Sequence, residues 1–160
     1  MKYRKILYLI IILSLFVFAG CTAKKVDKVD EVNKVDKVNK LNEDESEKIK
    51  VKVEAVAENI LQGLKEKDYE SFSKDFDDDM KKTMTEELFK ELHNTITPSI
   101  GKYQSKEFWM VEEDEGYYAV FYKGKFDKEP KDVIVKVVVS DKDEDIKVTG
   151  FFVDSPNLRK

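Results

Sequence analysis

Apolar residues recur with two different periods along the chain, and the change of period separates a helical half from a strand half. From residue 46 to residue 64 they follow at intervals of three and four, as on one face of an α-helix: Ile49, Val53, Val56, Ile60 and Leu64. Ser46 can cap such a helix, because its hydroxyl can accept a hydrogen bond from an amide of the first turn. The folded part is therefore predicted to begin near Ser46 with one long amphipathic helix.

Three shorter helices are predicted between this helix and Gly101. Each begins at a side chain that suits a helix N-terminus, namely Asp68, Asp77 or Thr85. The apolar residues expected to face inward from the last of them are Leu88, Phe89, Leu92 and Ile96. Pro98 and Gly101 are predicted to close the helical half, since neither continues a helix well.

Beyond Gly101 the apolar positions alternate, which is typical of half-buried strands. Polar turns at residues 114–116, 127–130 and 141–145 separate four such strands. Helices followed by hairpin strands predict an α+β domain, with N-terminal helices packed on a four-stranded antiparallel sheet over residues 46–155. Residues 156–160 then form a C-terminal tail.

The N-terminus has the layout of a secretory signal. Three positive residues, Lys2, Arg4 and Lys5, precede a predominantly apolar run over residues 6–18, which is followed by small residues before Cys21. The run is shorter than the roughly 20 residues that a spanning helix needs. An uncleaved membrane helix and a signal peptide cut without lipidation are the alternatives.

The sequence Ala19-Gly20-Cys21 resembles the lipobox of bacterial lipoproteins, although Phe18 stands where that family prefers Leu. The resemblance implies that residues 1–20 are a signal peptide cut between Gly20 and Cys21. It also implies that Cys21 carries a diacylglyceryl group and further acyl chains such as palmitate. The lipid bilayer would then be a partner through Cys21, with the protein anchored on the extracytoplasmic face of the cell membrane.

Residues 21–45 are predicted to be a disordered, charged tether. Every third residue is apolar between residues 26 and 41, and a period of three would spiral around a helix and leave no face to bury. A short coiled segment or a strip that binds a partner are the alternatives.

The folded half also resembles a known family. The letters "KDYESFSKDFDDDMKKTMTEELFKEL" and "GKYQS" carry the resemblance through Asp68-Tyr69, Phe76-Asp77, Met80, Leu88 and Gly101. Over residues 48–153 the chain is similar to a bacterial lipoprotein domain family of unknown function (the 3887 type), thought to share the nuclear transport factor 2-like, cystatin-like α+β fold. That fold implies a curved sheet wrapped around helices with a cavity at its wide end, but it implies no activity.

Charge and cysteine content narrow the possible partners. The formal net charge of the 160-residue chain is −4, and removal of three positive charges with residues 1–20 brings it to −7. Such an acidic surface argues against nucleic acid as a partner. The single cysteine excludes an internal disulfide.

Few side chains in the sequence are good candidates for catalysis or metal binding. His93 is the only histidine, and Glu87 and Glu91 are weak candidates to orient it as a base. Asp75, Asp77 and Asp79 alternate as in a calcium loop, but Met80 occupies the sixth place, where the sharp turn requires Gly. We therefore expect no catalytic residue, no metal and no cofactor.

Aromatic residues are dense in the predicted sheet, and strand alternation places rings on both of its faces. The candidates for a pocket or an interface are His93, Trp109, Tyr118 and Tyr122. We expect a membrane-anchored, non-enzymatic module that binds an extracytoplasmic ligand or protein. A small isomerase or lyase working in the cavity and a homodimer formed through the open sheet face are the alternatives.

Overall fold

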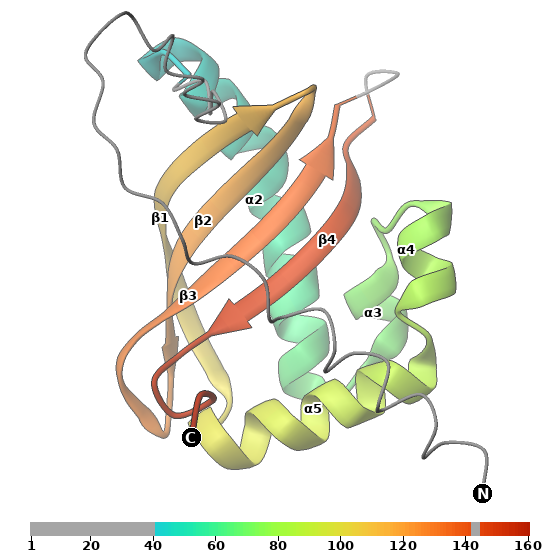
Figure 1. Ribbon diagram of the computed structural model, residues 1–160, viewed down its shortest axis with the longest axis vertical. Coiled ribbons are helices and arrows are strands. Elements are labelled where there is room, and N and C mark those ends of the chain that lie inside the picture. Colours follow the sequence, from blue (N-terminus) through green and yellow to red (C-terminus); the bar gives the residue numbers. More distant parts are fainter. Residues whose placement is uncertain (1–40, 142–144) are drawn as a thin grey trace, which may run out of the picture. The chain divides into compact units, whose positions relative to one another are not determined.

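The computed structural model describes residues 41–141 and 145–160, and these confirm an α+β architecture with helices first and a four-stranded antiparallel sheet afterwards (Figure 1). The predicted signal peptide, Cys21 and most of the predicted tether lie outside the described residues. The elements are α2 (Glu43–Glu66), α3 (Tyr69–Ser73), α4 (Asp78–Thr83), α5 (Glu86–Ile100), β1 (Tyr103–Asp114), β2 (Tyr117–Phe126), β3 (Glu129–Ser140) and β4 (Lys147–Asp154).

Helix α2 begins before the predicted point, so Ser46 is not its cap. Asn42 is the N-cap, and its side chain accepts a hydrogen bond from the backbone amide of Glu45, 2.9 Å away. The Glu45 carboxylate accepts one from the Asn42 amide in return. This reciprocal capping box, with an acidic first turn at the positive end of the helix dipole, outweighs what a single serine hydroxyl could offer.

The other predicted helix starts are confirmed. Asp68, Asp77 and Thr85 each accept a hydrogen bond from a backbone amide of the helix that follows. Helix α5 continues through Pro98 and ends at Ile100, and Gly101 follows with a φ of 86°.

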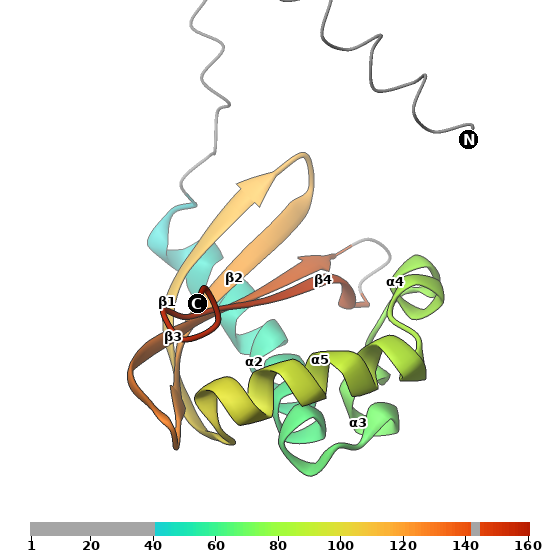
Figure 2. The same cartoon turned by 60° about the horizontal axis from the view of Figure 1, so that its bottom comes forward.

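The sheet has the order β1-β2-β3-β4, and the described helices lie on one of its faces (Figure 2). The first hairpin turn is where it was predicted, whereas the second is shorter because β3 already begins at Glu129. A register shift between β3 and β4 adds one residue to β4, so Val148 and Phe151 both face the core. The adjacent Phe152 is therefore on the opposite face and 54% exposed.

The core fills the space between the helices and the inner face of the sheet. The predicted apolar positions of α2 are buried, and so are the alternating valines of β3: Val133, Val135, Val137 and Val139. Leu88 was predicted to face inward, but it is 44% exposed, because Phe89 takes the core position in the first turn of α5.

Candidate functional site

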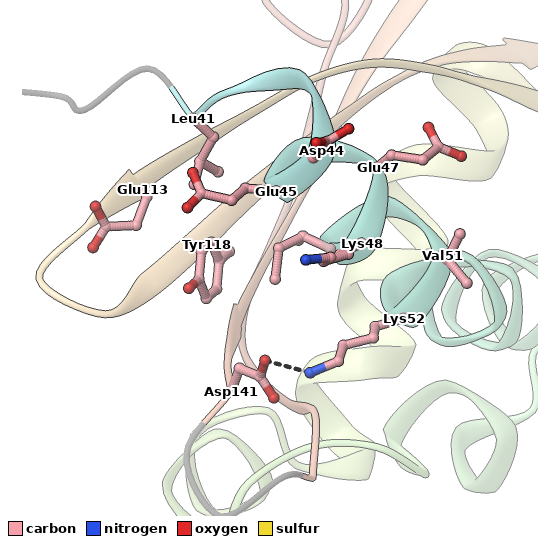
Figure 3. Close-up of a pocket in the computed structure, with 11 residues that line it drawn as sticks. Leu41, Asp44, Glu45, Glu47, Lys48, Val51, Lys52, Glu113, Tyr118 and Asp141 are labelled. Carbon is pink, nitrogen blue, oxygen red and sulfur yellow. Dashed lines mark hydrogen bonds and ion pairs between the residues drawn. The ribbon is translucent and has the colours of Figure 1, made fainter.

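A groove of about 970 Å³ lies between the beginning of α2, the tip of the β1–β2 hairpin and the end of β3 (Figure 3). Three elements that are distant in sequence thus contribute to one concave surface. The residues that line it are Leu41, Asp44, Glu45, Glu47, Lys48, Ile49, Val51, Lys52, Glu113, Tyr118 and Asp141.

Helix and strand periodicity explain why these side chains meet. Lys48 and Lys52 are four residues apart on α2, so they lie one above the other on the same helix face. Glu113 and Tyr118 are directly paired across β1 and β2 beside the hairpin turn, and paired residues share a face of the sheet. Figure 3 shows Tyr118 opposite Lys48 across the groove, with Val51 at the rim.

The lining of the groove is predominantly acidic. Five carboxylates and two ammonium groups give it a formal charge of −3. Lys52 forms an ion pair with Asp141, and Glu47 forms one with Lys50, with 3.0 Å between nitrogen and oxygen. Oδ1 of Asp141 is buried and has no hydrogen-bond partner among the described residues. The groove therefore holds more negative charge than its own cations neutralise.

Apolar side chains lie among these charges. Ile49 is buried at the base of α2 and Tyr118 is partly buried on β2, while Leu41 packs against the edge of the core. Tyrosine joins a large apolar ring to a polar hydroxyl, which suits a surface that is apolar and charged at once. The groove can thus contact a ligand that carries both apolar and charged groups.

Of the four residues predicted for a pocket or interface, only Tyr118 lines this groove. Tyr122 is fully buried, with its ring centroid 6.2 Å from that of Phe108 and 5.3 Å from Nζ of Lys106. Tyr122 is on the same face of β2 as Tyr118, but it lies four residues farther from the hairpin tip and is buried in the core, so it does not reach the groove. Burial raises the pKa of the Tyr122 hydroxyl.

Trp109 lies on the opposite face of the sheet and is 47% exposed. Its ring meets that of Phe121 edge to face at 6.3 Å, and Nζ of Lys123 lies 5.4 Å from its centroid. Phe152 and Tyr117 are also exposed, and strand register places them on this outer face as well. These rings form an aromatic surface that is separate from the groove.

His93 lies on α5, which contributes no residue to the groove. Its Nδ1 is buried without a hydrogen-bond partner among the described residues. Burial lowers the pKa of the imidazole below its ordinary value of 6.5, which favours the neutral form of the ring. The structure therefore does not bring His93, Trp109, Tyr118 and Tyr122 together into one site.

A buried ammonium group lies between α2 and β1, at a position that the sequence analysis did not single out. The side chain of Lys106 is 4% exposed and forms ion pairs with Glu54 and Glu58. The Tyr103 hydroxyl donates a hydrogen bond to the same Glu58 carboxylate, with 2.9 Å between the oxygens. None of these residues lines the groove, so the cluster joins two elements and does not extend the candidate site. The spacing of Glu54 and Glu58, one turn apart beside the apolar stripe, was the available signal.

Within residues 41–141 and 145–160, no group of three or more His, Cys, Asp or Glu side chains is arranged to hold a metal ion. Asp77, from the alternating aspartates, instead caps α4 by accepting a hydrogen bond from the Met80 amide at 2.7 Å. In the same described ranges, no helix is long and apolar enough to cross a membrane.

Comparison with known protein families decides where the domain belongs. Residues 57–151 match the family described as "Protein of unknown function (DUF3887)", and this span covers the C-terminal part of α2, helices α3 to α5 and nearly the whole sheet. The chain belongs to the DUF3887 family. The resemblance of the folded half to that family is thereby confirmed. No curated protein and no solved structure matches the chain.

The groove extends beyond the span that the DUF3887 family covers. Its hairpin side, Glu113 and Tyr118, lies within residues 57–151, as does Asp141. Its helical side comes from residues 41–52, which precede that span. One wall of the candidate site is therefore built by the helical extension that leads into the DUF3887 domain.

Proposed function

We propose that this protein is a membrane-anchored, extracytoplasmic lipoprotein whose DUF3887 domain binds a ligand in the groove between α2 and the β1–β2 hairpin. The groove itself carries the proposal. Its volume of about 970 Å³ lies at the upper end of the roughly 300–1,000 Å³ typical of ligand sites. Its lining mixes apolar side chains with charged ones that could fix the orientation of a ligand.

The anchor is part of the proposal, and the N-terminal sequence supports it. A basic start, an apolar run and Gly20-Cys21 are the features of a lipoprotein signal. A flexible tether of about twenty residues would let the domain reach roughly 25 Å from the bilayer. The domain would thus meet its ligand beyond the lipid headgroups while remaining at the membrane.

Binding without catalysis suits the groove better than a reaction does. Its lining includes no histidine, serine or cysteine, so it holds none of the usual nucleophiles activated by a general base. The carboxylate-tyrosine contact between Glu58 and Tyr103 lies outside it. We also propose that the helices and sheet are a version of the nuclear transport factor 2-like fold, in which the groove would correspond to the cavity.

Mass spectrometry of the protein extracted from its native membrane tests the anchor. The expected N-terminal residue is Cys21, with the added mass of a diacylglyceryl group and further acyl chains. The Cys21→Ala variant should lose that mass and accumulate with its first twenty residues attached. An intact Met1 terminus on the unaltered protein, or a mature chain without acyl mass, would overturn the proposal.

Methyl NMR of the full-length chain in nanodiscs of zwitterionic lipid tests binding in the groove. Leu41, Ile49 and Val51 line the groove, whereas Leu88 is exposed on α5 outside it. A library of small molecules and short peptides should contain compounds that shift the three groove methyl signals and leave Leu88 unchanged. A library that shifts none of them would contradict the proposed site.

A homodimer formed through the outer face of the sheet is the second candidate, favoured by the exposure of Trp109 and Phe152 on that face. If Cys21 is acylated, a Phe152→Cys variant has one free thiol, and a short bismaleimide should join two copies in the membrane. Leu88→Cys is the matched control, because that residue is also exposed but lies on α5. Equal cross-linking of both variants, or none, would dismiss the dimer.

A further inference from the structure

We infer that the ligand of the groove is a basic, amphipathic peptide segment, in which lysine or arginine side chains stand beside apolar ones. This inference rests on the proposed function, because it uses the same groove, and it adds the chemical class of the ligand. Charge, apolar surface and size support it in turn.

The charge of the groove favours a cation. Lys52 is already paired with Asp141, and Glu47 is paired with Lys50, which lies outside the lining. Apart from these two pairs, the lining carries three carboxylates and one ammonium group, that of Lys48. Asp44 forms no ion pair within the described ranges. The whole chain carries a net charge of −4, so a basic ligand would be attracted at long range and again within the groove.

The groove also has apolar residues, which favour a ligand that carries apolar groups as well as charge. Leu41 and Tyr118 both line the groove (Figure 3), and Val51, which is 67% exposed, continues the apolar surface at the rim. Burying such surface contributes about 25 cal/mol per Å². A purely polar cation would leave it in contact with water, whereas apolar side chains between basic ones would cover it.

The size of the groove favours a chain segment over a single amine. A volume of about 970 Å³, bounded by the first turns of α2 on one side and a hairpin on the other, exceeds what one ammonium group and its neighbours would fill. An extended segment lying between the two walls could place a basic group near Asp44 while its apolar side chains contact Tyr118. An anionic ligand would instead meet the excess of carboxylates.

Fluorescence anisotropy with labelled heptapeptides tests the inference, using the full-length chain in nanodiscs of zwitterionic lipid, with empty nanodiscs as background. The first peptide alternates lysine and leucine. The second replaces leucine with serine at the same charge, and the third replaces lysine with glutamate. The lysine-leucine peptide should bind at least tenfold more tightly than either of the others.

Two charge reversals in the first turn of α2 locate the binding. Asp44→Lys removes a carboxylate from the groove and should raise the Kd of the lysine-leucine peptide at least threefold. Glu43→Lys is the matched control, because Glu43 is in the same first turn but does not line the groove. Both changes place a positive charge at the N-terminal end of the helix dipole. A difference in Kd between the two variants therefore reflects contact with the groove and not a change in the folding of α2.

The possible outcomes separate a wrong ligand class from a wrong proposed function. Equal binding of the serine peptide or the glutamate peptide would overturn the inference, and so would equal effects of the two reversals. If dodecylammonium binds and the lysine-leucine peptide does not, the inference of a peptide ligand is wrong, and the ligand is a single-chain amine. If no peptide binds while the methyl NMR screen finds other compounds, the inference about the ligand class is wrong and the groove remains a binding site. If that screen also finds no compound, the proposed function is wrong as well.

Discussion

Nζ of Lys106 lies 2.9 Å from Oε2 of Glu58, so a buried ammonium group on β1 is bound by a carboxylate of α2. Glu54, one helical turn earlier, binds the same ammonium group. The aromatic ring of Tyr122 lies on another side of it, with its centroid 5.3 Å from Nζ. The sheet and its longest helix are thus joined by a charged contact as well as by apolar packing.

Replacement of Lys106 by methionine keeps the apolar stem of the side chain but removes its charge. We expect Lys106→Met to lower the free energy of unfolding by about 1–2 kcal/mol, because two carboxylates and a tyrosine ring lose a charged partner. The loss should fall short of that for a fully buried ion pair, since Glu54 and Glu58 are 51% and 41% exposed. Urea denaturation, followed by far-UV circular dichroism, measures the difference.

Lys125→Met is the matched control for that change. Lys125 forms an ion pair with Asp132 between β2 and β3, but both side chains are well exposed. Solvent-exposed pairs contribute little to stability, so this variant should unfold almost as the unaltered protein does. Equal losses for the two variants would mean that the burial of Lys106 has no special effect.

The pH dependence of stability should change when Glu58 is replaced. Burial alone would raise the pKa of Glu58, but the hydrogen bonds from Lys106, Gln62 and Tyr103 and the charge of Lys106 outweigh it and lower the pKa below 4.5. A lowered pKa stabilises the fold above pH 4.5, and this contribution is lost as the pH falls through the pKa of the folded state.

Chemical denaturation of the unaltered protein and of Glu58→Gln, from pH 8 to pH 3, checks this effect. The stability difference between the two should be constant from pH 8 to about pH 5.5 and should shrink below about pH 4.5. A difference that grows as the pH falls would show that the pKa of Glu58 is raised, not lowered.

In the Gly63→Ala variant, the higher helix propensity of alanine and the close packing around residue 63 have opposite effects on stability. In an exposed helix this substitution would stabilise by about 1 kcal/mol. A Cβ at Gly63, however, would lie 2.4 Å from the backbone nitrogen of Phe72 and 2.9 Å from the Asp68 carbonyl oxygen. Because backbone atoms cannot move aside easily, we expect a net loss of about 2 kcal/mol or more in the free energy of unfolding.

Gly116→Ala is the comparison for that variant. A Cβ at Gly116 would have nothing within 4 Å, so only the positive φ of 83° opposes alanine there. The expected cost is about 1 kcal/mol. A Gly63→Ala variant that is more stable than the unaltered protein would mean that α2 and α3 do not approach as closely as described.

Local patterns predicted most of the fold because each rests on a local cause. Asp68, Asp77 and Thr85 precede helices that their own side chains cap, and the valines of β3 alternate because one face of the strand is buried. The sequence pattern places Asn42 and Glu45 in the charged tether, whereas the reciprocal cap that these two residues form starts α2 at Glu43. The register shift beside β4 was also missed, since it depends on pairing with β3.

The candidate site was predicted only in part, because it depends on contacts between distant segments. Strand alternation gives Tyr118 and Tyr122 the same face of β2, but it does not say how far α2 extends over that face. Tyr122 is buried in the core, whereas a groove separates the beginning of α2 from Tyr118, so one ring belongs to the core and the other to the groove. Asp44 and Lys48 could not be assigned to the groove before the start of α2 was known.

The pKa of His93, the only histidine, reports how far its side chain on α5 is buried. Burial lowers the pKa of His93 below 6.5, so the folded state resists protonation of the ring. A lowered histidine pKa means that stability is lost as the pH falls below the value of 6.5 in the unfolded chain. Proton NMR of the only imidazole should show a midpoint below pH 6.5, and His93→Gln should flatten the loss of stability between pH 7 and pH 5. A midpoint above 6.5 would contradict the described burial.

Trp109 is the only tryptophan, so its fluorescence reports on the outer face of the sheet without interference. Because it is 47% exposed, acrylamide should quench it efficiently when each nanodisc holds a single copy of the protein. If the outer face forms the homodimer, quenching should fall severalfold when copies are crowded in proteoliposomes, because the partner would cover the ring.

A tryptophan moved to α5 provides the control for crowding itself. In the double variant Trp109→Phe, Leu88→Trp, the new ring replaces a side chain that is 44% exposed, close to the 47% of Trp109, but it lies outside the outer face. Its quenching should be the same in nanodiscs and in proteoliposomes. Equal loss of quenching at both positions would show a general effect of crowding, whereas no loss at either would leave the aromatic face open to solvent. Only protection confined to Trp109 supports a dimer through this face, because the two rings differ in location and hardly in exposure.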